Sequence, residues 1–148
     1  MWQSIVAIVG TLAGAVTTGL VQQRGARAER EVGRADAARA QRAQAVTALL
    51  TALADHRLAM VLREEALLGW GVDSPVYAAA RERSHRTRSA VTTPHTTLAI
   101  LAPDLAPAAQ AAVNATYAIR GAHDADVLET RRATAVRATD DLIAAAQA

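Results

Sequence analysis

The four histidines carry the most versatile chemistry in this chain, because imidazole can bind a metal ion or transfer a proton near neutral pH. They are His56, His85, His95 and His123. Glu82 and His85 match half of the Glu-x-x-His pattern of carboxylate-bridged di-iron proteins. Such a site needs two of these motifs and a glutamate from each of two other helices, whereas here only Glu64 and Glu65 could assist. We therefore predict no metal site and no cofactor.

Two of the other histidines, His56 and His123, stand beside acidic residues without forming a catalytic pair. Asp55 and His56 are neighbours on a predicted helix, so their side chains point about 100° apart and Asp55 is poorly placed to orient a base. Asp124, next to His123, has the position of a helix N-cap. The sequence contains no Gly-x-Ser-x-Gly turn, phosphate loop or dinucleotide-binding glycine motif. We predict that the protein is not an enzyme.

One group of arginines has two interpretations. It comprises Arg81, Arg83, Arg86 and Arg88. Arg81, His85 and Arg88 are three, four and seven residues apart and share a helix face. This face either keeps the helix solvated or contacts the phosphates of nucleic acid. No aromatic residue that could stack on bases lies nearby, and the net charge is only +2, so the sequence supports nucleic-acid binding weakly.

Composition indicates which elements position these residues. Hydrophobic residues make up 51% of the chain, but many are alanine, phenylalanine is absent and aromatic residues reach only 3%. Alanine, leucine and arginine are strong helix formers, and strand-favouring residues are sparse. Cysteine is absent, which excludes disulfides. The sequence predicts an all-α protein with a thin core.

The N-terminal segment 1–21 is predicted to be a retained transmembrane anchor. No charged residue occurs from Trp2 to Val21, and about 20 helical residues span roughly 30 Å, the thickness of the hydrocarbon core of a bilayer. A cleaved signal peptide is the main alternative, since Ala13-Gly14-Ala15 resembles a cleavage site. However, no basic region precedes the apolar run, and the run continues past this site. A helix that packs on the core of a small soluble domain is also unfavourable, because the segment is apolar all round and lacks a polar face.

Residues 22–45 are predicted to form a basic helical stalk after the anchor. The arginines closest to the anchor are Arg24, Arg27, Arg30 and Arg34. Because no basic side chain precedes the span, the positive-inside rule places the N-terminus outside the cell membrane and the rest of the chain in the cytoplasm. Each arginine near an anionic leaflet gains about 1 kcal/mol, so we predict contacts between these arginines and lipid headgroups.

Small residues four apart run along the predicted span. Gly10, Gly14 and Thr18 form one such row, which would let two helices approach closely in lipid. The alternative is that these glycines merely reflect a composition rich in small residues. We predict a homo-oligomer that associates through this row.

The remaining residues, 46–148, are predicted to form a small antiparallel bundle of three or four helices. In the first helix, apolar residues recur at spacings of three, four and seven up to Leu68, and Gly69-Trp70-Gly71 ends it. Ser74 and Pro75 are suited to begin a second helix that extends to about Leu101.

The third helix is expected over 108–120, between proline-containing and glycine-containing connections. Asp124 then precedes a fourth helix in which Leu128, Ala135 and Leu142 are seven residues apart. Short connections between consecutive helices favour antiparallel neighbours.

Five strings are distributed along nearly the whole chain: MWQSIVAIVGTLAGAVTTGLVQQRGARAER, ALADHRLAMVLRE, SHRTRSAVTTP, LAILAP and ATYAIRGA. Together they resemble the small KilB-type plasmid-spread proteins of actinomycetes. The resemblance implies an integral membrane protein that acts with other spread proteins to move plasmid DNA across septal cross-walls, and it supplies no active-site residues. It favours a non-enzymatic membrane scaffold in plasmid transfer or conjugation. The alternative is a membrane-tethered DNA-binding module that uses the arginine-rich helix face.

Overall fold

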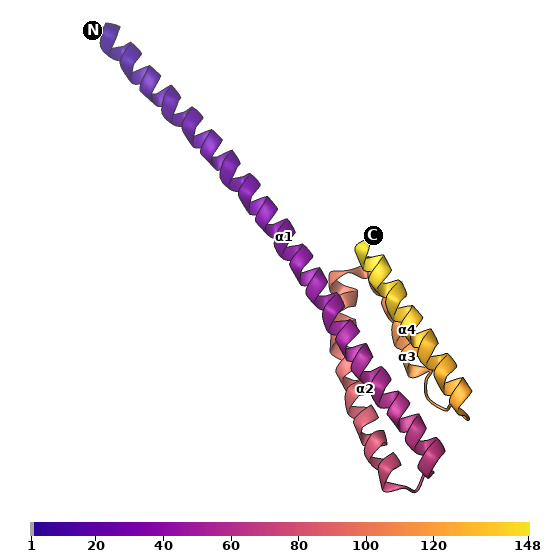
Figure 1. Cartoon of the computed structure of the whole chain (residues 1–148). Coiled ribbons are helices and arrows are strands. Elements are labelled where there is room, and N and C mark those ends of the chain that lie inside the picture. The colour runs from indigo at the N-terminus through magenta and orange to yellow at the C-terminus, as the bar shows by residue number, and fades with distance from the viewer. Residues whose placement is uncertain (1) are drawn as a thin grey trace. The chain divides into compact units, whose positions relative to one another are not determined.

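The computed structural model describes the backbone of residues 2–148 and the side chains of residues 32–148. This part of the chain is all-α, as predicted, and contains no strand. The elements are α1 (Trp2–Trp70), α2 (Pro75–Leu101), the short 3-10 helix η1 (Pro103–Leu105), α3 (Ala106–Tyr117) and α4 (Ala125–Gln147) (Figure 1). The predicted contact residues Gly10, Gly14, Thr18, Arg24, Arg27 and Arg30 lie outside the residues whose side chains are described.

The chain divides into two compact units, 1–40 and 41–148. In the first unit, the side chains of residues 32–40 are exposed, including that of Arg34. Asp36 and Arg39 form an exposed ion pair of 2.6 Å one helical turn apart. Exposed pairs of this kind contribute only a few tenths of a kcal/mol, about as much as other i,i+3 helix pairs.

Among the described residues, one stretch of α1 could cross a membrane by length and composition, Val32–Trp70. The protein itself buries 44% of the most apolar part of this stretch, and a core helix of a soluble protein can meet the same criteria of length and composition. The predicted anchor 1–21 is a different segment and lies outside the side chains that the structure describes.

Helices α2 and α4 begin directly after the residues that were predicted to cap them. The Ser74 side chain accepts a hydrogen bond from the backbone N–H of Tyr77 at 3.1 Å, and Pro75 begins α2. The Asp124 carboxylate accepts one from the N–H of Val127 at 2.7 Å and begins α4. Gly71 reverses the chain after α1 at a φ of 81°, a conformation that glycine adopts without strain. These two caps confirm the predicted starts of the second and fourth helices.

The third helix is displaced from its predicted position. It was expected over 108–120, but α3 runs from Ala106 to Tyr117. Pro107 stands in the first turn of α3, where its missing N–H costs no hydrogen bond, so the helix begins before this residue and not after it. Residues 118–121 form a turn after α3.

Within residues 41–148, the helices pack on two groups of buried apolar side chains. The first contains Leu49 and Leu53 from α1, Leu98 from α2 and Leu142 from α4, all 0% exposed, with small residues of α3 such as Ala112. The second contains Met60 and Val61 of α1 together with Ile119, Ala122, Leu128 and Ala135. The predicted row Leu128, Ala135 and Leu142 is buried, whereas Leu68, near the end of α1, is 42% exposed.

Candidate functional site

Polar residues occupy part of the buried side of α1. The buried row continues from Leu49 and Leu53 through His56 and Met60 to Arg63, at helical spacings of three and four. His56 is 1% exposed and Arg63 8% exposed, and the adjacent Glu64 is 0% exposed. The sequence prediction missed this cluster because it followed apolar residues only. The helical spacing could have identified it, since His56, Arg63 and Glu64 all extend the core-facing side of α1.

His56 is a buried neutral imidazole. Its Nδ1 lies 2.9 Å from the hydroxyl of Thr87 on α2, and its ring meets that of Tyr117 edge-on with centroids 5.3 Å apart. Its Nε2 has no hydrogen-bond partner among the described residues. Burial, and secondly the nearby positive charge of Arg88, lower the pKa of His56 from 6.5 to about 4. This histidine is therefore uncharged at neutral pH.

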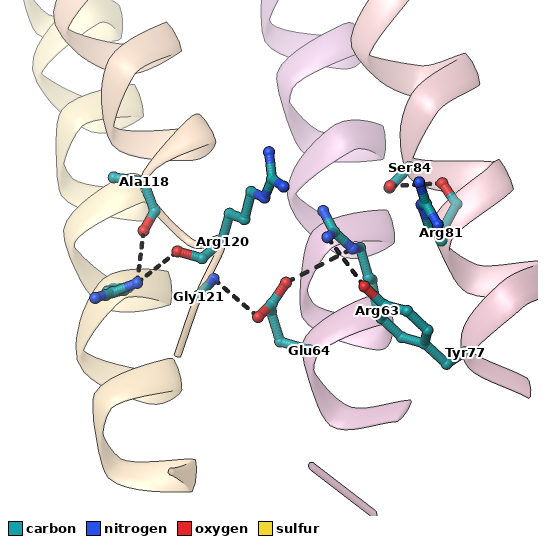
Figure 2. Close-up of polar contacts among 9 residues, drawn as sticks. Arg63, Glu64, Tyr77, Arg81, Ser84, Ala118, Arg120 and Gly121 are labelled. Carbon is teal, nitrogen blue, oxygen red and sulfur yellow. Dashed lines mark hydrogen bonds and ion pairs between the residues drawn. The ribbon is translucent and has the colours of Figure 1, made fainter. Parts of the chain in front are cut away.

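Arg63 and Glu64 link α1 to two other parts of the chain (Figure 2). Nη2 of Arg63 donates a hydrogen bond to the Tyr77 hydroxyl on α2 at 3.2 Å. Oε2 of Glu64 accepts one from the backbone N–H of Gly121 at 2.9 Å. Nε of Arg63 and Oε1 of Glu64 are 3.8 Å apart, and neither atom has a hydrogen bond within the described part of the chain. Buried charges of this kind depend on each other for compensation.

The turn that contains Gly121 is also held from α4. Nη1 of Arg131 donates to the carbonyl oxygens of Ala118 at 3.2 Å and Arg120 at 2.6 Å, and Figure 2 labels these two acceptor residues. These contacts satisfy carbonyls that follow the end of α3 and have no partner within that helix. The backbone that carries Arg120 is thus fixed by Glu64 on one side and Arg131 on the other.

A cavity of about 300 Å³ opens beside the buried cluster. The described residues that line it come from α1, α2, α3 and the turn after α3, and they are His56, Met60, Arg63, Ser84, His85, Arg88, Tyr117 and Arg120. The guanidinium carbon of Arg88 lies 4.1 Å from the centroid of the Tyr117 ring, a cation–π contact. This arrangement is suited to hold an anion. We call it the basic cavity.

The four arginines singled out from the sequence, Arg81, Arg83, Arg86 and Arg88, are all exposed on α2. Only Arg88 lines the basic cavity. At 100° per residue, Arg81 and Arg88 project from one side of the helix, and Arg83 and Arg86 from another. The four side chains therefore do not form one continuous patch on α2, and their contact with nucleic acid stays a prediction.

Of the acidic and histidine motifs of the sequence, only His56 and His85 contribute side chains to the basic cavity. Glu82 is exposed on α2, and no group of three His, Cys, Asp or Glu side chains suited to a metal ion occurs among the described residues. His123 lies 3.2 Å from Asp124 at the exposed start of α4. Asp124 itself is occupied as the N-cap of that helix.

Comparison with known proteins places these helices in a family. Residues 43–148, which include the whole basic cavity, match the family described as KilB plasmid transfer protein. The chain belongs to the KilB family. It is also 51% identical over 146 residues to "Protein KilB" of Streptomyces lividans, an alignment that covers 99% of this chain and 96% of that protein. No solved structure matches the chain.

Membership of the KilB family confirms the resemblance that the sequence strings indicated. The similarity to the Streptomyces protein also extends over the N-terminal segment that precedes the family match. KilB proteins are described as plasmid transfer proteins and not by any enzymatic reaction.

Proposed function

We propose that the protein is a non-enzymatic, membrane-anchored scaffold that associates with itself and takes part in plasmid transfer. The observation that carries this proposal is membership of the KilB plasmid transfer family across residues 43–148. Supporting it, the described helices of residues 41–148 pack on two groups of buried apolar side chains and carry charged residues on their exposed faces. Other membrane proteins of the transfer apparatus are its proposed partners.

The proposed bundle of residues 41–148 would serve as the scaffold's cytoplasmic domain. Side chains of α1 contact each of the other three α-helices or their connections: His56 contacts Thr87, Arg57 contacts Thr139 at 3.4 Å, and Glu64 contacts Gly121. Many of the buried positions are alanine, which removes less apolar surface from water than larger residues do. Packing against another copy of the chain would add to this limited stabilisation.

The membrane anchor is supported by the uncharged segment from Trp2 to Val21 and by the arginines after it. Deleting residues 2–21 should move the protein from the membrane to the soluble fraction after cell lysis and ultracentrifugation. A variant in which Arg24, Arg27, Arg30 and Arg34 become glutamine should remain in the membrane after an alkaline carbonate wash. Release of this charge-neutralised variant would show instead that lipid headgroups alone hold the chain at the surface.

Self-association is proposed to run through Gly10, Gly14 and Thr18 of the span. Gly14→Ile places a branched side chain where two backbones would approach, and it should weaken dimerisation in detergent by about tenfold or more. Sedimentation equilibrium of the full chain measures this. Val16→Ile, on another side of the span, is the matched control and should leave the dimer unchanged. An unaltered oligomer in Gly14→Ile would refute association through this row.

A further inference from the structure

We propose that the basic cavity binds a small phosphate monoester through Arg63, Arg88 and Arg120. The three guanidinium groups come from α1, α2 and the turn after α3, three separate parts of the chain. Figure 2 shows the Arg120 side chain extending from this turn toward α1. Arg63 is 8% exposed, so at least one of these cations is held within the folded protein and not on its surface.

The charges around the cavity are unbalanced. None of the described residues that line it is acidic. Arg88 and Arg120 have no carboxylate within 4.0 Å in the described part of the chain, and Arg63 has only Glu64, at 3.8 Å. Arg88 and Arg120 are exposed, so water screens part of the repulsion among the three cations, and an anion bound between them would remove the remainder.

Two of the guanidinium groups are already fixed in position. The Tyr117 ring holds Arg88 by a cation–π contact of 4.1 Å, which leaves its N–H donors available. The Tyr77 hydroxyl holds Arg63 through Nη2, and Nε of Arg63 faces Oε1 of Glu64 at 3.8 Å. Donors that are ordered before the ligand arrives lose little conformational entropy on binding.

The number of cations and the size of the cavity favour a phosphate monoester over a simple carboxylate. A phosphate monoester carries a charge of about −1.5 to −2 at pH 7 and three strong acceptor oxygens, which suits several arginines. The cavity volume of about 300 Å³ lies at the lower end of the range for small-molecule sites, so it has room for an organic group as well as the phosphate. Met60 and the Tyr117 ring provide apolar surface for that group.

Isothermal titration calorimetry of the full chain in maltoside detergent tests this proposal, with inorganic phosphate and glycerol 3-phosphate as probes. Glycerol 3-phosphate should bind, and Arg88→Gln or Arg120→Gln should each weaken it by about tenfold to a hundredfold. Arg137→Gln, an exposed substitution on α4 outside the cavity, is the matched control and should change the affinity less than twofold. Circular dichroism would establish that each variant retains its helical content.

A phosphate monoester could come from a lipid headgroup or from a soluble ester, and reconstitution of the protein with lipid vesicles distinguishes these two sources. If a lipid headgroup occupies the cavity, phosphatidic acid in phosphatidylcholine vesicles should raise the apparent Kd for glycerol 3-phosphate. If the natural ligand is a soluble ester, phosphatidic acid should leave that Kd unchanged.

Three results would overturn the proposal. The first is an absence of binding to both probes at millimolar concentrations. The second is an equal loss of affinity in Arg86→Gln, which would mean that the arginines of α2 attract anions diffusely. The third is binding of a short DNA duplex without binding of glycerol 3-phosphate, which would assign Arg88 to a nucleic-acid surface.

Discussion

Replacing Glu64 with alanine should lower the free energy of unfolding by about 3–5 kcal/mol, because it leaves buried Arg63 without a compensating charge. The substitution also removes the acceptor for the backbone N–H of Gly121, 57 residues away in sequence. An unpaired buried donor adds its own desolvation cost. Urea denaturation of the full chain in detergent, followed by circular dichroism, measures the loss.

The neighbouring residue provides a matched control for this prediction. Glu65 has the same side chain but is exposed, so Glu65→Ala should change stability by less than about 0.5 kcal/mol. Glu64→Gln retains an oxygen that can accept from Gly121 while removing the charge, and its loss should be intermediate. Equal stability of Glu64→Ala and Glu65→Ala would mean that Glu64 does not hold the turn after α3 against α1.

The parts of the fold that depend on local chemistry were predictable from the sequence. Ser74 and Asp124 cap helices through hydrogen bonds to backbone groups three residues away, so their roles follow from short-range patterns. The seven-residue spacing of Leu128, Ala135 and Leu142 likewise identified the buried face of α4. The start of α3 was not predicted because a proline was taken to precede the helix, although proline is tolerated in its first turn.

The basic cavity could not be predicted, because it depends on contacts between distant segments. His56 and Thr87 are 31 residues apart, and the Tyr117 ring that holds Arg88 belongs to another helix. Charged and polar residue types usually indicate a solvated surface, so the sequence pattern placed Arg81, His85 and Arg88 on a helix face that is either solvated or in contact with phosphates. Only the packing of α1, α2 and α3 brings Arg63, Arg88 and Arg120 around one space.

Acidification from pH 6.5 to 4 should destabilise the protein by up to about 3 kcal/mol through His56 alone. Above pH 6.5 this histidine is neutral in both the folded and the unfolded chain, so its contribution is fully present. Between pH 6.5 and about 4 the unfolded chain takes up a proton that the folded chain excludes, and stability falls. Below about pH 4 both states are protonated and the loss stops growing. Urea denaturation at a series of pH values measures this dependence.

His56→Gln isolates this effect, since glutamine does not titrate and all other ionisable groups remain. The stability difference between the wild type and His56→Gln should shrink as the pH falls from 6.5 to 4, and a constant difference would contradict a buried neutral histidine.

Protonated His56 would join Arg63, Arg88 and Arg120 around the cavity. An anion bound there should therefore raise the pKa of His56, so glycerol 3-phosphate should reduce the acid-induced loss in the wild type. In Arg88→Gln this protection should be weaker, because the cavity would hold the anion less tightly.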